Sequence, residues 1–175
     1  MEDVITLIDK IVEEHKMVTR TVQTLEQAAN DTKAAVELEK GKESFMPGRI
    51  EQRQGLQRLQ ELLETIAPSL QEHFNMEETR LLAAFEKYAD KELVSALHFL
   101  LVDHEELRNR LARLRELVTE LDSKKLSRQV WEAKAYDMRA YVSHTRKLLE
   151  AHAETELSLL QKLRSELAGR EKGNN

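Results

Sequence analysis

The chain has 175 residues, of which 34% are charged, and a net charge of −5 at pH 7. This length is typical of one domain, and it is sufficient to bury a core without disulfide bridges. Cysteine is absent, which excludes disulfides, zinc–thiolate sites, iron–sulfur clusters and thiol nucleophiles. Any metal would therefore be held by His, Asp or Glu side chains.

Acidic and basic residues are interspersed along the chain, as they are on solvated helix faces. There is no basic stripe of the kind that binds nucleic acid, and no apolar run approaches the ~20 residues of a membrane span. The first residues, Met1-Glu2-Asp3, are acidic and lack the positive charge that begins a secretory signal. We therefore expect a soluble cytoplasmic protein, a monomer or a homodimer, that binds neither nucleic acid nor a membrane.

Helix-forming residues dominate the chain, and only two prolines and five glycines interrupt them. Apolar residues recur at the three- and four-residue spacing of a helix face in four long segments. In chain order, the predicted helices cover residues 2–29, 49–88, 90–121 and 127–167. Four such helices with short links predict an all-α fold, an antiparallel four-helix bundle over residues 1–168. The polar residues 169–175 are expected to form a disordered tail.

The expected interruptions also follow the chain. Asn30-Asp31 is a plausible end for the first helix, and residues 31–48 are ambiguous between extra helical turns and a loop that contains Met46-Pro47-Gly48. Pro68 lies inside the second helix, where proline removes a backbone donor, so we expect a kink or a restart there. Asp122-Ser123 predicts the turn between the third and fourth helices.

Four of the six histidines lie on the predicted inward faces, one on each helix. They are His15, His73, His104 and His152. Each histidine continues the apolar stripe of its helix. His104, for example, comes seven residues after Leu97 and seven before Leu111, and this spacing keeps all three side chains on one face.

Two of these histidines begin an H-x-x-x-E pattern, His73 with Glu77 and His152 with Glu156. Such a pair alone is weak evidence, because Asp and Glu fill 32 of 175 positions and most exposed pairs at this spacing are structural. Buried carboxylates without partners are costly, however, and a metal ion would balance them. Nitrogen and oxygen ligands without sulfur suit iron, manganese or zinc. Di-iron carboxylate bundles use such ligands on facing helices.

The segments 14–15, 73–78, 103–107 and 152–156 resemble the hemerythrin-like (HHE cation-binding) family. The order H…HxxxE…H…HxxxE matches that family across nearly the whole chain. The resemblance implies a hemerythrin-like bundle around two iron ions joined by an oxo or hydroxo bridge, with manganese or zinc as other candidates. It implies that Glu77 and Glu156 bridge the ions. It also implies terminal ligands, which are His15, His73, His104 and His152.

The chain departs from the oxygen-carrying hemerythrins at two positions. Those proteins have HxxxH on the third helix and HxxxxD on the fourth. Here Arg108 stands where the second histidine of the third-helix motif would be, and the fourth-helix motif ends at Glu156. Fewer protein ligands leave more open positions on iron, which favours reactive chemistry over reversible oxygen carriage. The pattern is similar to the di-iron domain of iron–sulfur cluster repair proteins. Those proteins usually carry a Cys-containing N-terminal region, which this sequence lacks.

The resemblance implies a non-haem di-iron protein that reacts with or senses O2, peroxide or NO, or that handles iron for donation. No acid/base pair in the sequence specifies a reaction. One alternative is an iron- or oxygen-responsive interaction module without turnover, whose metal-dependent order a protein partner would read. Another is a metal-free helical interaction protein.

The remaining polar and aromatic residues near the motifs have less specific expectations. Arg108 would either pair with a buried carboxylate or extend to solvent. His98 and His144 are expected on the flank or surface, and Tyr141 and Trp131 in the core. Three acidic residues are expected to face solvent. They are Glu78, Glu105 and Glu106.

Overall fold

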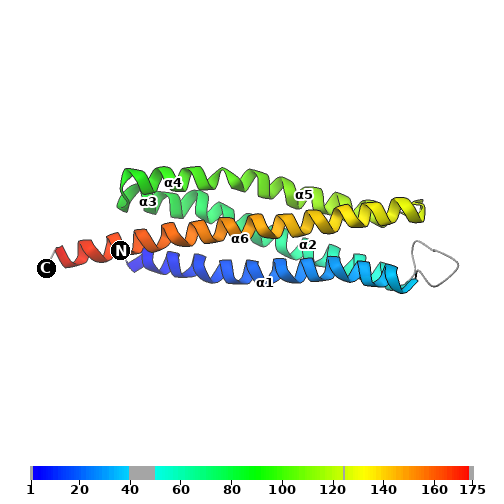
Figure 1. The fold of residues 1–175 in the computed structure, drawn as a ribbon. Coiled ribbons are helices and arrows are strands. Elements are labelled where there is room, and N and C mark those ends of the chain that lie inside the picture. The colour runs from blue at the N-terminus through cyan, green and yellow to red at the C-terminus, as the bar shows by residue number, and fades with distance from the viewer. Residues whose placement is uncertain (1, 40–49, 124, 174–175) are drawn as a thin grey trace.

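The structure is a computed structural model, and it describes residues 2–39, 50–123 and 125–173. Four helical segments lie side by side, and successive segments run in opposite directions (Figure 1). The elements are α1 (Glu2–Glu39), α2 (Ile50–Met76), the π-helix η1 (Glu77–Leu81), α3 (Leu82–Tyr88), α4 (Lys91–Leu101), α5 (Asp103–Leu121) and α6 (Arg128–Gly173). No strand occurs among these residues. The predicted all-α, antiparallel four-helix bundle is confirmed.

Two helices are longer than predicted. α1 continues past the expected end at Ala29 to Glu39. The stop signal there is overridden because Thr32 is buried and its hydroxyl donates to the Ala29 carbonyl at 2.6 Å, which keeps this turn helical and packed. α6 likewise continues past Leu167 to Gly173, since the residues that follow include no proline. The predicted loop at Met46-Pro47-Gly48 lies outside the described residues.

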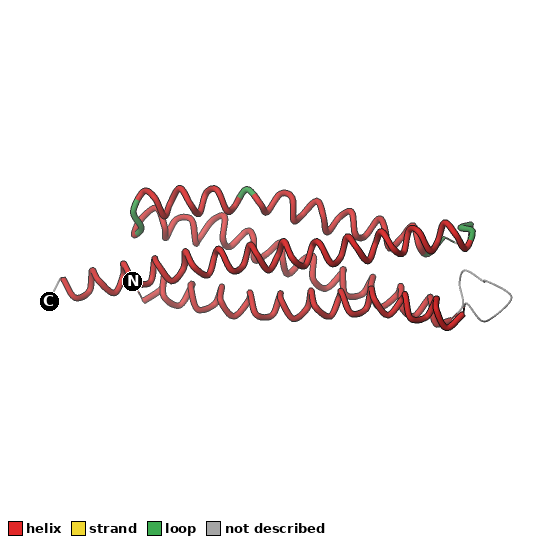
Figure 2. The backbone as a smooth tube through the Cα atoms, in the orientation of Figure 1, coloured by secondary structure: helices red, strands yellow, loops and turns green. Residues whose placement is uncertain are grey.

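For the second helical segment, the sequence predicted a kink or a restart at Pro68. α2 neither ends nor restarts at Pro68. Instead, the α-helical hydrogen-bonding pattern changes at Glu77, where η1 begins. A second interruption, at Val102 between α4 and α5, was not predicted at all and is visible as a short loop in Figure 2. At the start of α4, the Asp90 carboxylate accepts a hydrogen bond from the Leu93 N–H at 2.8 Å, which caps that helix as N-cap residues do.

The core consists of two separate apolar clusters, one in each half of the bundle, and both are built from all four helical segments. The first cluster extends along α2 as far as Phe74 and along α6 as far as Leu149. The second extends from Leu7 to Ile11 on α1 and from Leu159 to Leu167 on α6. Trp131 is buried in the first cluster, as predicted, and its indole N–H donates to the Leu121 carbonyl at 3.0 Å.

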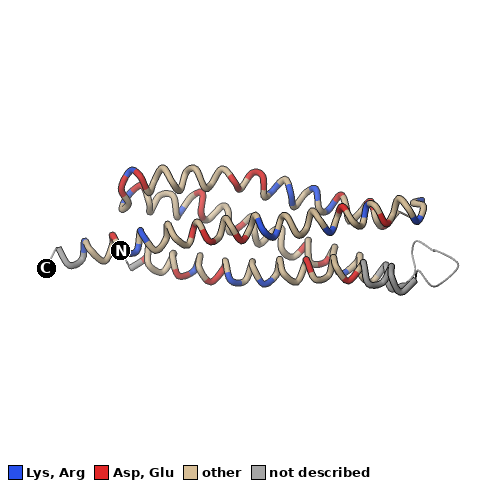
Figure 3. The backbone as a smooth tube through the Cα atoms, viewed as in Figure 1, with Lys and Arg blue, Asp and Glu red and all other residues tan. Residues whose placement is uncertain are grey.

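Acidic and basic residues are interspersed along all four segments of the described chain (Figure 3). None of the helices in the described ranges combines the length and the apolar character of a membrane span.

Candidate metal centre

A polar layer lies between the two apolar clusters, and it contains all six residues for which the sequence predicted a metal role. His15 comes from α1, His73 from α2, Glu77 from the first position of η1, and His104 from α5. His152 and Glu156 lie one turn apart on α6. Five of the six are buried, and Glu77, His104 and Glu156 have no exposed surface. Every helical segment therefore contributes to the layer.

These residues form two groups that could each hold a metal ion. His15, His73, Glu77 and Glu156 form the first group, and Glu77, His104 and His152 form the second. Within each group, the potential ligand atoms lie within 4.8 Å of one another. Glu77 belongs to both groups. Its Oε1 lies 2.5 Å from His73 Nε2, and its Oε2 lies 3.0 Å from His104 Nε2.

Both interruptions of regular helix occur beside residues of this layer. Glu77 is the first residue of η1, and the break at Val102 comes two residues before His104. A π-helical turn widens the helix and changes the direction in which the following side chains point, and such turns are frequent at functional sites. The local backbone therefore departs from ideal geometry where the two groups meet.

Three further carboxylates orient the histidines from outside the layer. Glu14 Oε2 lies 2.8 Å from His73 Nδ1, and Glu78 Oε1 lies 2.8 Å from His104 Nδ1. Asp103 Oδ2 lies 3.4 Å from His152 Nδ1. A carboxylate at Nδ1 accepts the proton there, which leaves the Nε2 lone pair free for a metal, as is common for metal-binding histidines.

No sequence pattern indicated these three carboxylates, and Glu78 was expected to face solvent. Glu78 is instead half-buried, because it pairs with His104. Glu14, Glu78 and Asp103 each stand next to a residue of the layer in sequence, but each contacts a histidine on a different helix. In the sequence, the only indication of their role was therefore that each lies next to a predicted metal ligand.

Arg108 pairs with a carboxylate, which was one of its two expected roles, but not with a carboxylate of the layer. Its Nη2 donates to Glu78 Oε1 at 2.7 Å, and its Nε donates to Gln71 Oε1 at 2.9 Å. Its guanidinium also lies 5.4 Å from the centre of the Phe74 ring. Phe74 in turn stacks on His104 at 4.1 Å. Arg108 thus supports His104 indirectly, through Glu78 and Phe74.

The other singled-out residues lie outside the two groups. His98 and His144 are exposed, as expected. The ring of Tyr141 is half-buried and carries the guanidinium of Arg110 at 4.1 Å. Arg110, which no sequence pattern indicated, is buried and donates to His144 Nδ1 at 3.0 Å and to Thr145 Oγ1 at 2.9 Å.

The charges within the layer shift the pKa values of its members. Burial lowers the pKa of His15, but contacts with Glu156 and Glu77 outweigh it and raise the pKa from 6.5 to about 9. Burial and the nearby charge of His104 lower the pKa of His152. Burial raises the pKa of Glu156, whereas the surrounding histidines hold that of Glu77 well below its usual value despite burial. The pKa values of the two glutamates are therefore shifted in opposite directions within one layer.

Several buried atoms of the layer lack hydrogen-bond partners, which fits a bound cation. Within the described part of the chain, Glu77 Oε2 and both carboxylate oxygens of Glu156 have none. His104 Nε2 lies 3.0 Å from Glu77 Oε2, and His15 Nε2 lies 2.9 Å from Glu156 Oε2. Neither of these two contacts has hydrogen-bond geometry. Unpaired buried carboxylate oxygens are costly, and metal ions satisfy them.

Comparison with known families agrees with this geometry. The family model described as the hemerythrin HHE cation-binding domain matches residues 6–163, a span that contains all six residues of the layer. This chain belongs to the hemerythrin HHE cation-binding family. Neither the curated proteins nor the solved structures gave a significant match. Membership in the HHE family implies that the chain binds a metal cation, and the two His/Glu groups are where the structure could hold it.

Proposed function

We propose that this HHE domain binds two metal ions, with iron as the preferred metal. His15, His73, Glu77 and Glu156 would hold the first ion, and His104, His152 and Glu77 the second. The observation that carries the proposal is the position of Glu77, whose two oxygens face histidines of different groups. A carboxylate placed in this way can bridge two ions. Glu156 belongs to the first group only, and its Oε2 lies 3.9 Å from His152 Nε2.

Iron is one of three metals that the donor atoms suit. Imidazole nitrogens and carboxylate oxygens without sulfur suit iron, manganese and zinc. Two ions on carboxylates and histidines of facing helices are the arrangement of di-iron and di-manganese bundles. A pair of iron ions would supply a redox-active centre able to react with O2, peroxide or NO.

The chain's own residues would control that centre in three ways. Glu14, Glu78 and Asp103 hold the histidine rings in the tautomer and orientation that a metal needs. The two apolar clusters exclude water from both ends of the layer. The second group offers only three residues, which leaves coordination positions available for an external ligand. We therefore propose a centre that reacts with or senses a small oxidant or NO.

Metal analysis tests the proposal. The protein is purified without chelator, incubated anaerobically with ferrous iron and desalted, and its iron content is measured with its ultraviolet–visible spectrum. We expect two irons per chain in the wild type and fewer in His73→Ala. His98→Ala is the matched control, because His98 is exposed and lies outside both groups. A wild-type protein that retains no iron, manganese or zinc would contradict the proposal.

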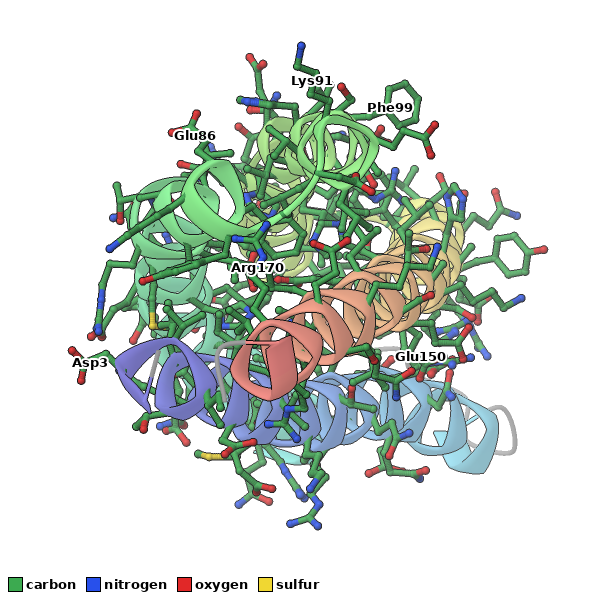
Figure 4. The ribbon with its side chains drawn as sticks, turned by 90° about the vertical axis from the view of Figure 1, so that its left-hand side faces the viewer. Asp3, Glu86, Lys91, Phe99, Glu150 and Arg170 are labelled. Atoms are coloured by element: carbon green, nitrogen blue, oxygen red, sulfur yellow. The ribbon has the colours of Figure 1, made fainter. Side chains whose placement is uncertain are left out.

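A second candidate function is a metal-responsive interaction module without turnover. Two exposed apolar side chains next to the α4–α5 break favour it. Phe99 is 83% exposed and Val102 is 71% exposed, and Phe99 points away from the bundle (Figure 4). Consumption of peroxide, or transfer of iron to an acceptor, would support the first function. Metal-dependent binding of a partner without either activity would support the second.

A further inference from the structure

Three surface cavities of the bundle each end at a histidine of the polar layer. One lies between α5 and α6 and reaches His152; we call it the α5–α6 pocket. A second lies between α1 and α6 and reaches His15, and a third lies between α1 and α2 and reaches His73. His104 has no exposed surface. The three cavities therefore offer three different approaches to the layer.

The α5–α6 pocket is the approach that leads to the second group. The cavities at His15 and His73 adjoin the group that holds four residues, whereas His152 belongs to the group that holds three. The first group has four potential ligand residues and the second has three, so an ion in the second group has more positions open. An external ligand that enters beside His152 would thus meet the ion best able to bind it.

The contact that covers His152 is also the longest of the three outer contacts. Asp103 approaches His152 Nδ1 at 3.4 Å, whereas Glu14 and Glu78 approach their histidines at 2.8 Å. The Asp103 side chain is 57% exposed. Glu14 also forms an ion pair with Lys10 at 3.6 Å, and Glu78 forms one with Arg108 at 2.7 Å. The pocket is therefore bounded by the least constrained carboxylate of the set.

The size and lining of the α5–α6 pocket define the ligand. Its volume is about 160 Å³, which is below the ~300–1,000 Å³ that is usual for the pockets of drug-sized ligands. The side chains that line it come from α5 and α6 and are Asp103, Glu106, Leu107, Leu148, Ala151, His152 and Thr155. The carboxylates of Asp103 and Glu106 disfavour anions in the pocket. The charge of Glu106 is only partly balanced, because the nearest Arg110 nitrogen lies 3.7 Å from its Oε1. The apolar side chains favour a small uncharged molecule.

We propose that the α5–α6 pocket is the entry and docking site for a small uncharged ligand, such as NO, O2 or hydrogen peroxide, on its way to the ion held by His104 and His152. This proposal rests on the proposed two-metal function. It assigns the approach to one face of the bundle and predicts that the larger cavity at His15, whose volume is about 440 Å³, is not the route.

Two alanines of α6 provide a matched pair of variants. Ala151 lines the α5–α6 pocket, and Ala153 lines the cavity at His15. Ala151→Leu and Ala153→Leu add the same atoms to the same helix, and leucine is a good helix former. Leu148→Phe fills the α5–α6 pocket from a second position, in case Ala151→Leu does not fold. Circular dichroism and iron content establish that each variant is intact.

The first readout is the rate at which NO binds to the ferrous protein in a stopped-flow experiment. We expect Ala151→Leu or Leu148→Phe to slow association about tenfold or more, as a blocked approach does, with no change in Ala153→Leu. Glu106→Gln should speed the association of azide, an anionic probe, in a manner that weakens with salt, and should leave NO unchanged. Equal rates in Ala151→Leu and Ala153→Leu would overturn the proposal.

The second readout needs no metal. Dissolved O2 enhances the relaxation of methyl protons near which it resides, so we expect NMR enhancement at Leu107 and Leu148 in the metal-free wild type and its loss in Ala151→Leu. Absence of enhancement in the wild type would overturn docking in this pocket even if iron binds normally. Failure of the wild type to bind any metal would instead overturn the proposed function and, with it, the route to an ion.

Discussion

The Nε2 atoms of His104 and His152 lie 3.1 Å apart in the centre of the bundle. Two imidazole nitrogens this close cannot both present lone pairs to each other without a proton or a cation between them. Both rings are buried, and both have a carboxylate at Nδ1 that accepts the proton there. The pair is therefore arranged to share a cation.

Metal loading should stabilise the bundle strongly, because the ions bind the folded layer and not the unfolded chain. At an ion concentration of ~100 times the Kd, the free energy of unfolding should rise by about 2.7 kcal/mol. For a chain of this size that corresponds to an increase in Tm of roughly 5–10 °C. Calorimetry of metal-free and iron-loaded protein measures the shift. Identical Tm values would show that no ion occupies the layer.

Glu77→Gln should reduce the number of ions bound per chain while it preserves the shape of the side chain. A neutral amide cannot bridge two cations as a carboxylate does, and Glu77 is the one residue common to both groups. Metal analysis after loading measures the stoichiometry. Glu105→Gln is the control, since Glu105 is exposed on α5 and belongs to neither group. Full occupancy in Glu77→Gln would exclude a bridging role.

Glu78→Ala should weaken metal affinity without removing a ligand. Its loss frees the His104 ring and leaves Arg108 without its carboxylate partner, and such outer partners typically contribute ~10–100-fold in affinity. Competition with a chromophoric chelator measures the change. Glu64→Ala, at an exposed position of α2, should have no effect. Equal affinities for the two variants would mean that Glu78 does not orient His104.

Metal uptake should release protons, because His15 must be neutral to bind an ion. Its pKa in the metal-free protein is raised to about 9 by Glu156 and Glu77, against the opposing effect of burial, so the ring carries a proton at pH 7. Metal affinity should therefore increase as the pH rises from 7 to 9. In a weakly buffered solution, an indicator dye measures the protons released. His15→Gln should release fewer.

The same pKa also affects the stability of the metal-free protein. The pKa of His15 is higher in the folded state than its value of 6.5 in an unfolded chain. Its contribution is therefore fully present below about pH 6.5 and is lost as the pH rises through 9. Burial lowers the pKa of His73, but its contacts with Glu77 outweigh that effect and raise the pKa, so His73 affects stability in the same direction. Chemical denaturation at pH 6 and pH 9 measures the loss, which His15→Gln should diminish.

Pro68→Ala should stabilise the protein. α2 continues through Pro68 without ending, so proline there only removes a backbone donor and crowds the preceding turn, and alanine should gain ~1–3 kcal/mol in the free energy of unfolding. Urea denaturation measures the change. Ser69→Ala, at the next exposed position, should change stability much less. A loss of stability in Pro68→Ala would show that α2 requires the local geometry that proline imposes.

Local patterns in the sequence were sufficient to predict the bundle and the residues of its polar layer. Helical periodicity depends only on neighbouring residues, and it placed His15 and His104 on inward faces because Ile11 and Leu107 share those faces. It also identified the glutamates four residues after His73 and His152. The structure brings all six predicted residues together, although their role as ligands remains a proposal.

The features that the sequence did not predict depend on how the helices pack. Glu14 and Glu78 contact histidines on other helices, and the relative register of two helices is not encoded in the spacing along either one. The break at Val102 contains no glycine or proline to indicate it. The π-helical turn at Glu77 likewise has no signature of its own, since its residues are ordinary helix formers.

The core is divided along the length of the bundle: two apolar clusters pack the helices together, and the polar layer between them holds the potential metal ligands. In each half, apolar side chains from all four segments pack against one another, so the helices are held together on both sides of the polar layer. We therefore expect each half to keep most of its own packing when a side chain of that layer is exchanged. The bundle is thus a frame into which different metal-binding sets can be substituted, and this chain's four histidines and two glutamates are one such set.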